Sequence, residues 1–373
     1  MSMASKGKAV VAMSGGVDSS VAAALLVEQG YDVTGIMLKL WSEGTENSGS
    51  GCCSVGAADD ARRVADALGI PFYVFNFAER FEATVVRDFH DTYMAGQTPN
   101  PCVRCNQWIK FDTLLGRAKQ LGAEILATGH YARVKEIDGR FHLYRGLDAA
   151  KDQSYVLWML TQAELRHVRF PIGEIPSKAE TRVIAEQLGL RTARKPDSQE
   201  ICFVRGGNIG DYIEEHVAGA AAPGPITDRQ GKVLGEHRGV GRYTVGQRRG
   251  LGIALGEPVF VTEIDRANNA VVVGPRDELA VGGLTTDESR FVAGPPRVGD
   301  ALLVQHRAHG EASAARVEAV DGGTIELTYE ASVEGIAPGQ SAAFYVASDP
   351  DRVIGGGIIS STVAVKPKVG ASL

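Results

Sequence analysis

Cysteine is scarce in this sequence and long hydrophobic runs are missing, and each shortage excludes a class of protein. Five cysteines in 373 residues are too few for a disulfide scaffold. No apolar run approaches the roughly 18–20 residues that a membrane-spanning helix needs. The first residues lack the apolar core of a signal peptide. We therefore expect a cytoplasmic protein without a membrane partner.

Basic charge is also in deficit. The 39 Lys and Arg side chains against 45 Asp and Glu give a net charge of −6, whereas nucleic-acid-binding domains are usually basic. The deficit is uneven, because residues 229–250 carry six basic side chains and one acidic one, while residues 277–334 carry four basic and eleven acidic ones. Glycines interleave the basic stretch and permit close approach to a phosphate backbone, so we expect RNA contact there.

Length and pattern predict three domains in a globular chain. Residues 1–208 alternate short apolar runs with helical periodicity, which predicts a doubly wound parallel sheet. Residues 209–285 are rich in glycine and short apolar runs, and they predict a small β-rich central domain. Residues 286–373 contain closely spaced short strands and an Asp-Gly-Gly turn, which predict an antiparallel β-barrel.

The clearest motif is SGGVDSS at residues 14–20, between the first expected strand and the first expected helix. Its glycines let the backbone approach a ligand, and N–H groups at a helix start form a cradle for an anion. It is neither the Walker loop nor GxGxxG, and an ordinary turn with a helix cap is the alternative. The motif resembles the loop of ATP pyrophosphatases, which cleave ATP between the α and β phosphates. That resemblance implies Mg²⁺, because Asp18 attracts phosphate only through a cation.

Three cysteines lie in or beside motifs. Cys102 and Cys105 form C-x-x-C, and Cys202 lies in DSQEICF. C-x-x-C alone fits a zinc half-site, a redox pair or an iron–sulfur site. Beside an ATP-cleaving loop it favours sulfur chemistry, because a sulfur nucleophile can displace AMP from an adenylated carbonyl. We expect Arg104 to favour the thiolate form of its neighbours.

Six motifs occur in one order: SGGVDSS, TPNPxxxCN, ATGHY, KDQSY, DSxxICF and PGQSAxFY. Together they closely resemble the tRNA-specific 2-thiouridylases over essentially the whole chain. The resemblance implies an N-terminal domain of the adenine nucleotide alpha hydrolase-like fold. It implies a tRNA-uridine 2-sulfurtransferase that thiolates the wobble uridine of tRNAs for Lys, Glu and Gln with ATP and a protein-borne persulfide. The implied partners are tRNA and an upstream sulfur-donor protein, and we expect a monomer.

The resemblance also assigns residues. Cys105 is the nucleophile, Cys202 carries the persulfide, and the two form a transient disulfide. Asn100, Pro101 and Cys102 touch the target base, and the central domain contacts tRNA. The positions that match the ATP site are Ala12, Met13, Ser14, Gly15, Gly16, Val17, Asp18, Ser19, Leu38 and Gly129. Those that match further tRNA contacts are His130, Lys151, Asp152, Gln153, Arg307, Ala308 and Gln340.

Cys102 departs from the family pattern, because many members carry an Asp there that is cast as the general acid or base. A thiol with an ordinary pKa of about 8.5 serves that role less readily. Alternatively, Cys102, Cys105 and Cys202 ligate three corners of a four-iron four-sulfur cluster and leave one iron open for sulfide. The sequence leaves persulfide and cluster chemistry both open, and it assigns no role to Cys52 and Cys53.

Two other functions compete with this interpretation. An ATP-pyrophosphatase amide ligase that acts on a small acid explains SGGVDSS but gives Cys105 and Cys202 no role. A non-catalytic iron–sulfur scaffold that binds RNA explains the thiols but not an intact ATP-cleaving loop. The 2-thiouridylase interpretation accounts for both features and is the leading prediction.

Overall fold

The computed structural model describes most of the chain. Cys52, Cys53 and residues 198–200 of the DSQEICF motif lie outside the described residues. None of the described helices is long and apolar enough to cross a membrane. The described residues are 5–41, 55–197, 201–204, 208–217 and 219–365.

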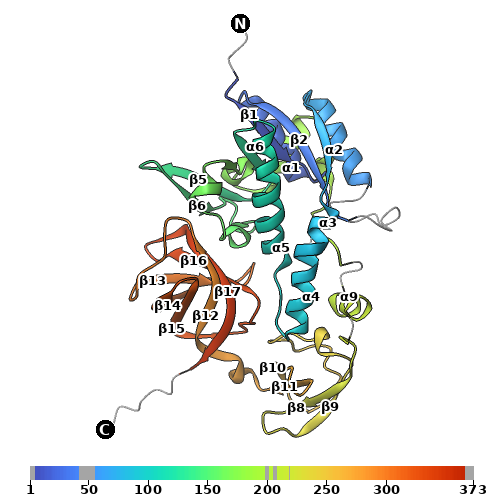
Figure 1. The fold of residues 1–373 in the computed structure, drawn as a ribbon, viewed down its shortest axis with the longest axis vertical. Coiled ribbons are helices and arrows are strands. Elements are labelled where there is room, and N and C mark those ends of the chain that lie inside the picture. Colours follow the sequence, from blue (N-terminus) through green and yellow to red (C-terminus); the bar gives the residue numbers. More distant parts are fainter. Residues whose placement is uncertain (1–4, 42–54, 198–200, 205–207, 218, 366–373) are drawn as a thin grey trace.

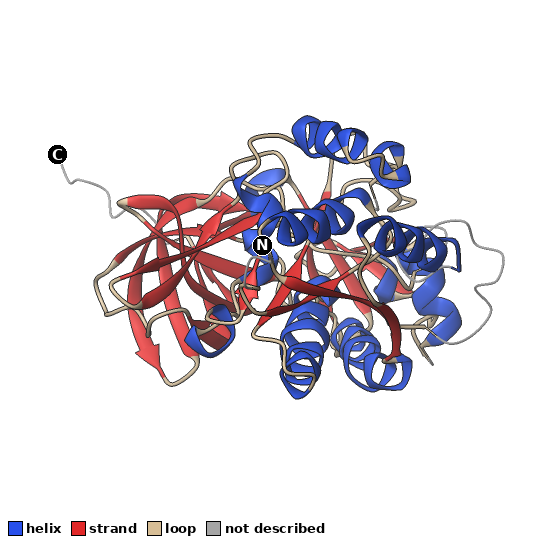
Figure 2. Cartoon of the chain, turned by 90° about the horizontal axis from the view of Figure 1, so that it is seen from above, coloured by secondary structure: helices blue, strands red, loops and turns tan. Residues whose placement is uncertain are grey.

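A parallel sheet with the strand order β3-β2-β1-β4-β7 forms the N-terminal part. Its central strands are continuous apolar runs, with Val10, Val11 and Leu126 buried, because helices lie on both sides of the strands (Figure 2). The strands are β1 (Lys8–Ala12), β2 (Asp32–Lys39), β3 (Phe72–Asn76), β4 (Ile125–Thr128) and β7 (Val168–Arg169).

Two long helices of this part contain π-helical stretches, which are rare and are frequently found at functional sites. The first runs through α3 (Ala78–Phe81), the π-helix η1 (Glu82–Val86) and α4 (Arg87–Met94). The second runs through α5 (Pro101–Arg104), the π-helix η2 (Cys105–Leu114) and α6 (Leu115–Gln120). The remaining α-helices are α1 (Val17–Glu28), α2 (Val55–Leu68), α7 (Gln162–Leu165), α8 (Lys178–Gln187) and α9 (Ile209–His216). Short 3₁₀ turns are η3 (Ser154–Leu157), η4 (Pro171–Glu174), η5 (Arg191–Arg194), η7 (Val240–Arg242) and η8 (Arg276–Leu279).

The C-terminal strands close into a barrel. They follow the antiparallel order β12-β15-β14-β13-β16-β17, and β17 pairs back with β12. Closure leaves no exposed sheet edge in the ring, and Leu284, Val304 and Phe344 fill its interior. The strands are β12 (Ala280–Phe291), β13 (Ala301–Gln305), β14 (Ser313–Asp321), β15 (Thr324–Glu334), β16 (Ser341–Val346) and β17 (Asp349–Ala364).

A hairpin from the N-terminal part extends the barrel sheet. It consists of β5 (Ala132–Ile137) and β6 (Arg140–Arg145), and β6 pairs with β17. Between the two parts in the sequence is a small sheet of order β10-β11-β8-β9, seen at the bottom of Figure 1. The predicted fold class is confirmed, and the exact domain boundaries stay a prediction. The small sheet contains β8 (Gly224–Thr227), β9 (Val233–His237), β10 (Phe260–Asp265) and β11 (Ala270–Gly274).

Candidate active site

The SGGVDSS motif folds as the turn between β1 and α1. Gly15 has a φ of +72°, and a Cβ on it would collide with the carbonyl of Ala57, so the position requires glycine. Gly16 caps α1, and the hydroxyls of Ser19 and Ser20 donate to its carbonyl at 3.2 and 2.9 Å. The turn therefore presents the N-terminus of α1, where backbone N–H groups attract an anion.

Gly129 follows β4 and packs against the same turn. A Cβ on Gly129 would lie 2.6 Å from the backbone nitrogen of Ser19, so glycine permits this close approach. Leu38 lies buried near the end of the neighbouring strand β2. The carboxyl ends of β2, β1 and β4 thus meet where ligands bind in such folds. The other predicted ATP positions, Ala12, Met13, Ser14 and Val17, lie in or beside the turn. Contact of these residues with ATP stays a prediction.

Asp18 is held by a lysine that sequence reasoning did not identify. Lys178 Nζ donates to both carboxylate oxygens at 2.7 Å, and the Tyr131 hydroxyl donates to Oδ1 at 2.9 Å. Lys178 begins α8, and its side chain is only 12% exposed. Lys178 therefore places a cation directly on the Asp18 carboxylate.

Asp197, from the DSQEICF motif, joins the same cluster. Its carboxylate pairs with Lys151 at 2.8 Å, Lys178 at 2.9 Å and Arg182 at 3.1 Å. Burial raises the pKa of Asp197, but hydrogen bonds from Lys151 and Lys178 outweigh it and lower the pKa to about 2. A set of cations this dense suits a polyphosphate.

Carboxylates that could bind a magnesium ion are few around this turn. Asp18 carries Lys178 on both oxygens, and Asp60 pairs with Lys195 at 2.8 Å. Within the described residues, no group of three His, Cys, Asp or Glu side chains could hold a metal ion. Mg²⁺ commonly binds through substrate phosphates, waters and only one or two carboxylates. The residues thus fit Mg²⁺ as an ion bound chiefly to the phosphates of ATP.

Cys102 and Cys105 lie at the start of the second long helix. The Asn100 side chain caps this helix by accepting from the Val103 N–H at 3.3 Å, and Pro101 occupies its first turn. Cys102 is exposed in α5, and Cys105 is half-buried as the first residue of the π-helix η2. A helix N-terminus favours the thiolate form of a cysteine.

Arg104 lies between the two cysteines, and the expectation that it favours their thiolates needs correction. Its buried guanidinium donates to both oxygens of Glu288 at 2.8 Å and pairs with Asp88 at 3.2 Å. Hydrogen bonds from Arg104 lower the pKa of Glu288, whereas burial raises the pKa of Asp88. With two carboxylates on it, Arg104 offers no net positive charge to a thiol.

Cys202 is exposed, and the residue after it anchors the segment in the core. The Phe203 ring packs edge-on against Phe89 of α4, with ring centroids 5.1 Å apart. Phe89 follows Asp88, which pairs with the residue preceding Cys105. Two successive residues of α4 therefore hold the neighbours of Cys202 and Cys105.

The iron–sulfur hypothesis gains no support from this arrangement. Cys102, Cys105 and Cys202 do not form a metal-binding group in the described part of the chain. A four-iron cluster needs its thiolates close together around one point. The three cysteines are not arranged in this way in the described conformation.

His130, a predicted tRNA-contacting residue, is buried in an aromatic cage. Its ring lies 6.2 Å from that of Phe111 and 5.8 Å from that of Phe170, measured between centroids. Its Nδ1 lies 2.6 Å from the hydroxyl of Thr128. Burial, and after it the charge of Lys110, lowers the pKa of His130 well below the usual value. The imidazole would have to leave this cage to contact tRNA.

The KDQ segment is likewise bound within the chain. The Asp152 carboxylate, 5% exposed, accepts from Arg145 at 2.8 Å and from the Ser154 hydroxyl at 2.8 Å. Lys151 pairs with Asp197, and the Gln153 side chain accepts from a backbone N–H. In this structure the segment joins the phosphate turn to the barrel hairpin, and tRNA contact stays a prediction.

Gln340 precedes β16 and contacts the cysteine segment directly. Its side-chain amide donates to the carbonyls of Thr98 and Pro99 at 3.2 and 3.0 Å. No local sequence pattern predicts this contact, because it joins residues of two different domains. Arg307 and Ala308 lie exposed in the loop after β13, where contact with tRNA also stays a prediction.

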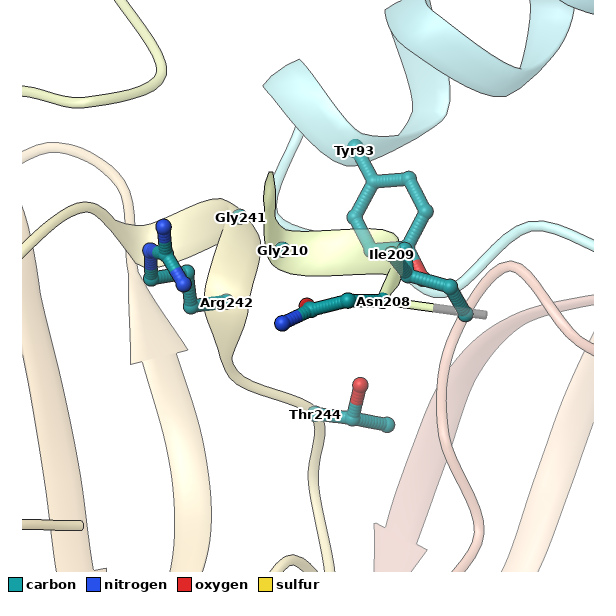
Figure 3. A pocket seen from close by; sticks show the side chains of 7 residues that line it. All are labelled: Tyr93, Asn208, Ile209, Gly210, Gly241, Arg242 and Thr244. Carbon is teal, nitrogen blue, oxygen red and sulfur yellow. The ribbon is translucent and has the colours of Figure 1, made fainter. Parts of the chain in front are cut away.

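A polar cavity of about 400 Å³ lies beside the end of α4, where α9 and η7 meet (Figure 3). Arg242 lines it but is engaged by Asp211 and Glu214. Elsewhere in the basic stretch, Arg238, Arg248 and Arg249 are exposed, and contact of this stretch with RNA stays a prediction. The cavity is lined by Tyr93, Asn208, Ile209, Gly210, Gly241, Arg242 and Thr244.

Three known domain families match successive stretches of the chain, one for each part of the fold. Residues 7–206 match the family described as the tRNA methyl transferase HUP domain. Residues 210–275 match the tRNA methyl transferase PRC-barrel domain, and residues 281–359 match the aminomethyltransferase beta-barrel domain.

Individual relatives extend over nearly the whole chain. The tRNA-specific 2-thiouridylase MnmA of Clostridium perfringens is 46% identical over 363 residues, covering 95% of this chain and 99% of the relative. That of Geotalea uraniireducens is 46% identical over 368 residues, covering 97% of each. Among solved structures, a 4-thiouridine synthetase–RNA complex with bound ATP has 18% identity and a TM-score of 0.35, covering 53% of this chain and 45% of that one.

The two 2-thiouridylase relatives set aside the amide-ligase and scaffold interpretations and confirm the predicted resemblance. This chain belongs to the tRNA-specific 2-thiouridylase family of sulfurtransferases.

Proposed function

We propose that this chain uses ATP to replace the 2-oxygen of the wobble uridine with sulfur in tRNAs for Lys, Glu and Gln. The observation that carries the proposal is where the described residues at the two ends of Cys202's motif, 195–197 and 201–204, are attached. Lys195 donates to the carbonyl of Gly15 at 2.9 Å, Asp197 pairs with Lys178, and Phe203 packs on α4. The phosphate turn and the Cys202 segment are thus parts of one connected structure.

The first step of the proposal is adenylation. The uracil O2 attacks the α-phosphorus of ATP, a P–O bond forms, and pyrophosphate leaves with the electrons of the broken bond. The N-terminus of α1 and the cluster that contains Lys178 hold the pyrophosphate, because the helix end is positive and the cluster has three cations against two carboxylates. Mg²⁺, when it enters with ATP, neutralises phosphate charge.

The second step is sulfur transfer. The terminal sulfur of a persulfide on Cys202 attacks C2, and AMP departs with the former 2-oxygen. The Cys105 thiolate then attacks Sγ of Cys202, which breaks the persulfide bond, releases the thiocarbonyl and leaves a Cys105–Cys202 disulfide. A dithiol reductant supplies two electrons to restore the thiols, and a sulfur-donor protein reloads Cys202. Cys102 occupies the family's acid–base position in this scheme.

Binding of tRNA is the remaining part of the proposal. The exposed arginines of the central domain, Arg238, Arg248 and Arg249, lie in glycine-rich turns and suit contact with phosphates. A cytoplasmic, monomeric enzyme remains our expectation from the sequence.

Mass spectrometry of tRNA nucleosides tests the function. Deletion of the gene should remove 2-thiouridine, and an unchanged nucleoside profile would refute the proposal. In the purified enzyme, Cys202→Ser should abolish thiolation while ATP and tRNA still bind, and full thiolation by that variant would reject the carrier role. Anaerobic thiolation with and without iron then separates persulfide from cluster chemistry, because only the cluster requires iron.

A further inference from the structure

Glu288 has an unusual backbone for a residue inside a strand. Its φ is +51°, in the left-handed region that favours glycine. The pairing of β12 with β17 shifts at this point, since Asp287 pairs with Ile358 and Arg290 pairs with Gly356. Two residues of β12 therefore lie opposite one residue of β17, which is a β-bulge. Bulges redirect side chains and are common next to active sites.

The redirected side chain reaches the cysteine helix. Both Glu288 oxygens accept from Arg104, each at 2.8 Å, and Arg104 is the residue immediately before Cys105. The guanidinium is also held by Asp88 at 3.2 Å and lies 4.7 Å from the centroid of the Trp108 ring. This bidentate geometry fixes the orientation of Arg104 as well as its position.

The barrel fastens the other end of the same segment. The Thr98 N–H donates to the Pro338 carbonyl at 2.8 Å, and Gln340 donates to the carbonyls of Thr98 and Pro99. Gly339, with a φ of +89°, permits the approach, since a Cβ there would lie 2.8 Å from the carbonyl oxygen of Thr98. Contacts with the barrel thus bracket residues 98–104.

The segment needs such external support. α5 spans four residues and continues directly into the π-helix that begins at Cys105. α5 is therefore the first turn of the long helix, and helix ends fray readily unless contacts from outside the helix hold them. The direction of the Cys105 thiol is then set by what holds Arg104.

We propose that Glu288 is a positioning residue for Cys105, acting through Arg104. On this proposal, which rests on the proposed function, the barrel orients the nucleophile for sulfur transfer. The left-handed backbone at Glu288 is kept because it aims the carboxylate at Arg104.

Substitutions at Glu288 can remove the carboxylate without disturbing the backbone. Glu288→Asn suits the left-handed conformation, and Glu288→Gln keeps the length of the side chain. Asp138 is a matched control, because it is an exposed acidic residue with a φ of +52° in the turn between β5 and β6. Asp138→Asn therefore replaces a carboxylate by an amide at the same backbone conformation, away from the cysteines.

Steady-state thiolation of tRNA, thermal melting and ATP-dependent pyrophosphate release are measured for each variant. We expect kcat for thiolation to fall roughly 10- to 100-fold in Glu288→Asn, the scale of a displaced reacting group. The KM for tRNA and the single-turnover rate of pyrophosphate release should stay at wild-type values, whereas the melting temperature should fall, because Arg104 loses one of its two carboxylate partners. Asp138→Asn should match wild type throughout. If Glu288→Asn does not fold, Glu288→Gln carries the same comparison.

Two results would overturn the proposal. Wild-type kcat in a folded Glu288 variant would show that Cys105 needs no such support. A rise in the tRNA KM with kcat unchanged would make Glu288 part of tRNA docking instead. Alkylation of Cys105, followed by mass spectrometry, does not depend on the proposed function: its rate should change in Glu288→Asn and not in Asp138→Asn. If wild type fails to thiolate tRNA while this rate still changes, the function fails and the positioning role stands.

Discussion

Replacement of Lys178 by Met tests the phosphate site most sharply. The substitution keeps the side chain's length and removes an ammonium that lies 2.7 Å from both oxygens of Asp18 and 2.9 Å from Asp197. Hydrogen bonds to charged groups contribute about 1.5–3 kcal/mol each. Because the Asp18 side chain is 32% exposed, water recovers part of that energy. We expect the free energy of unfolding to fall by about 2 kcal/mol.

The effect on turnover should be larger than the effect on stability. If Lys178 stabilises the departing pyrophosphate, its loss removes charge where charge develops in the transition state, which costs about 10²–10³ in kcat. ATP-dependent pyrophosphate release in the presence of tRNA measures this. Lys151→Met is the matched control, because Lys151 pairs with Asp197 at 2.8 Å and no described hydrogen bond joins it to Asp18. Its kcat should fall less.

A second variant decides whether Lys178 acts on phosphate or only neutralises Asp18. The double substitution Asp18→Asn with Lys178→Met removes both charges, so much of the lost stability should return. If turnover returned with it, the ammonium would be only a counter-ion and the phosphate role would be wrong. Wild-type pyrophosphate release in Lys178→Met alone would refute the reasoning directly.

Three further predictions concern the same region. Gly129→Ala should raise the KM for ATP, measured by pyrophosphate release, because its Cβ would lie 2.6 Å from the Ser19 nitrogen; an unchanged KM would contradict this packing. The pKa of Asp197 is held at about 2, below the ordinary 3.8. Its ion pairs therefore stabilise the fold above pH 3.8, and this stabilisation is lost as the pH falls through about 2. The free energy of unfolding, measured with urea across that window, should depend less on pH in Asp197→Asn than in wild type. Asp152→Asn should reduce the free energy of unfolding by about 3–5 kcal/mol, because it leaves the buried pairing of Arg145 broken, and a wild-type urea midpoint would show the pairing to be unimportant.

The phosphate turn could be predicted from sequence because its chemistry is local. The glycines and serines that shape it are adjacent in the chain, and the left-handed φ of Gly15 is a local requirement of the turn that favours glycine. Lys178 could not be found this way. It lies 160 residues from Asp18 in the chain and begins an ordinary helix whose sequence signal, Ser177 as a cap, concerns only helix formation.

The sequence motifs also did not predict whether the side chains in them are buried or exposed. His130 and Asp152 belong to matched motifs, yet the structure places both side chains inside the protein. A sequence motif specifies which residue types occur together in a short stretch of chain. It does not separate a residue that touches a ligand from one that holds the backbone beneath it, because both requirements restrict the choice of side chain.

The acidic character of the C-terminal part has a structural use that a charge total conceals. Glu288 pairs with Arg104, and Asp351 of β17 pairs with Arg133 of β5 at 3.1 Å. Both arginines are buried side chains that precede the barrel in the chain. Barrel carboxylates help to neutralise their buried charge, in the case of Arg104 together with Asp88. Part of the acidic excess therefore binds the cysteine segment and the hairpin to the barrel, and it does not oppose RNA. The net charge of −6 therefore includes acidic groups that are engaged between domains, and it conceals the exposed arginines of the central domain.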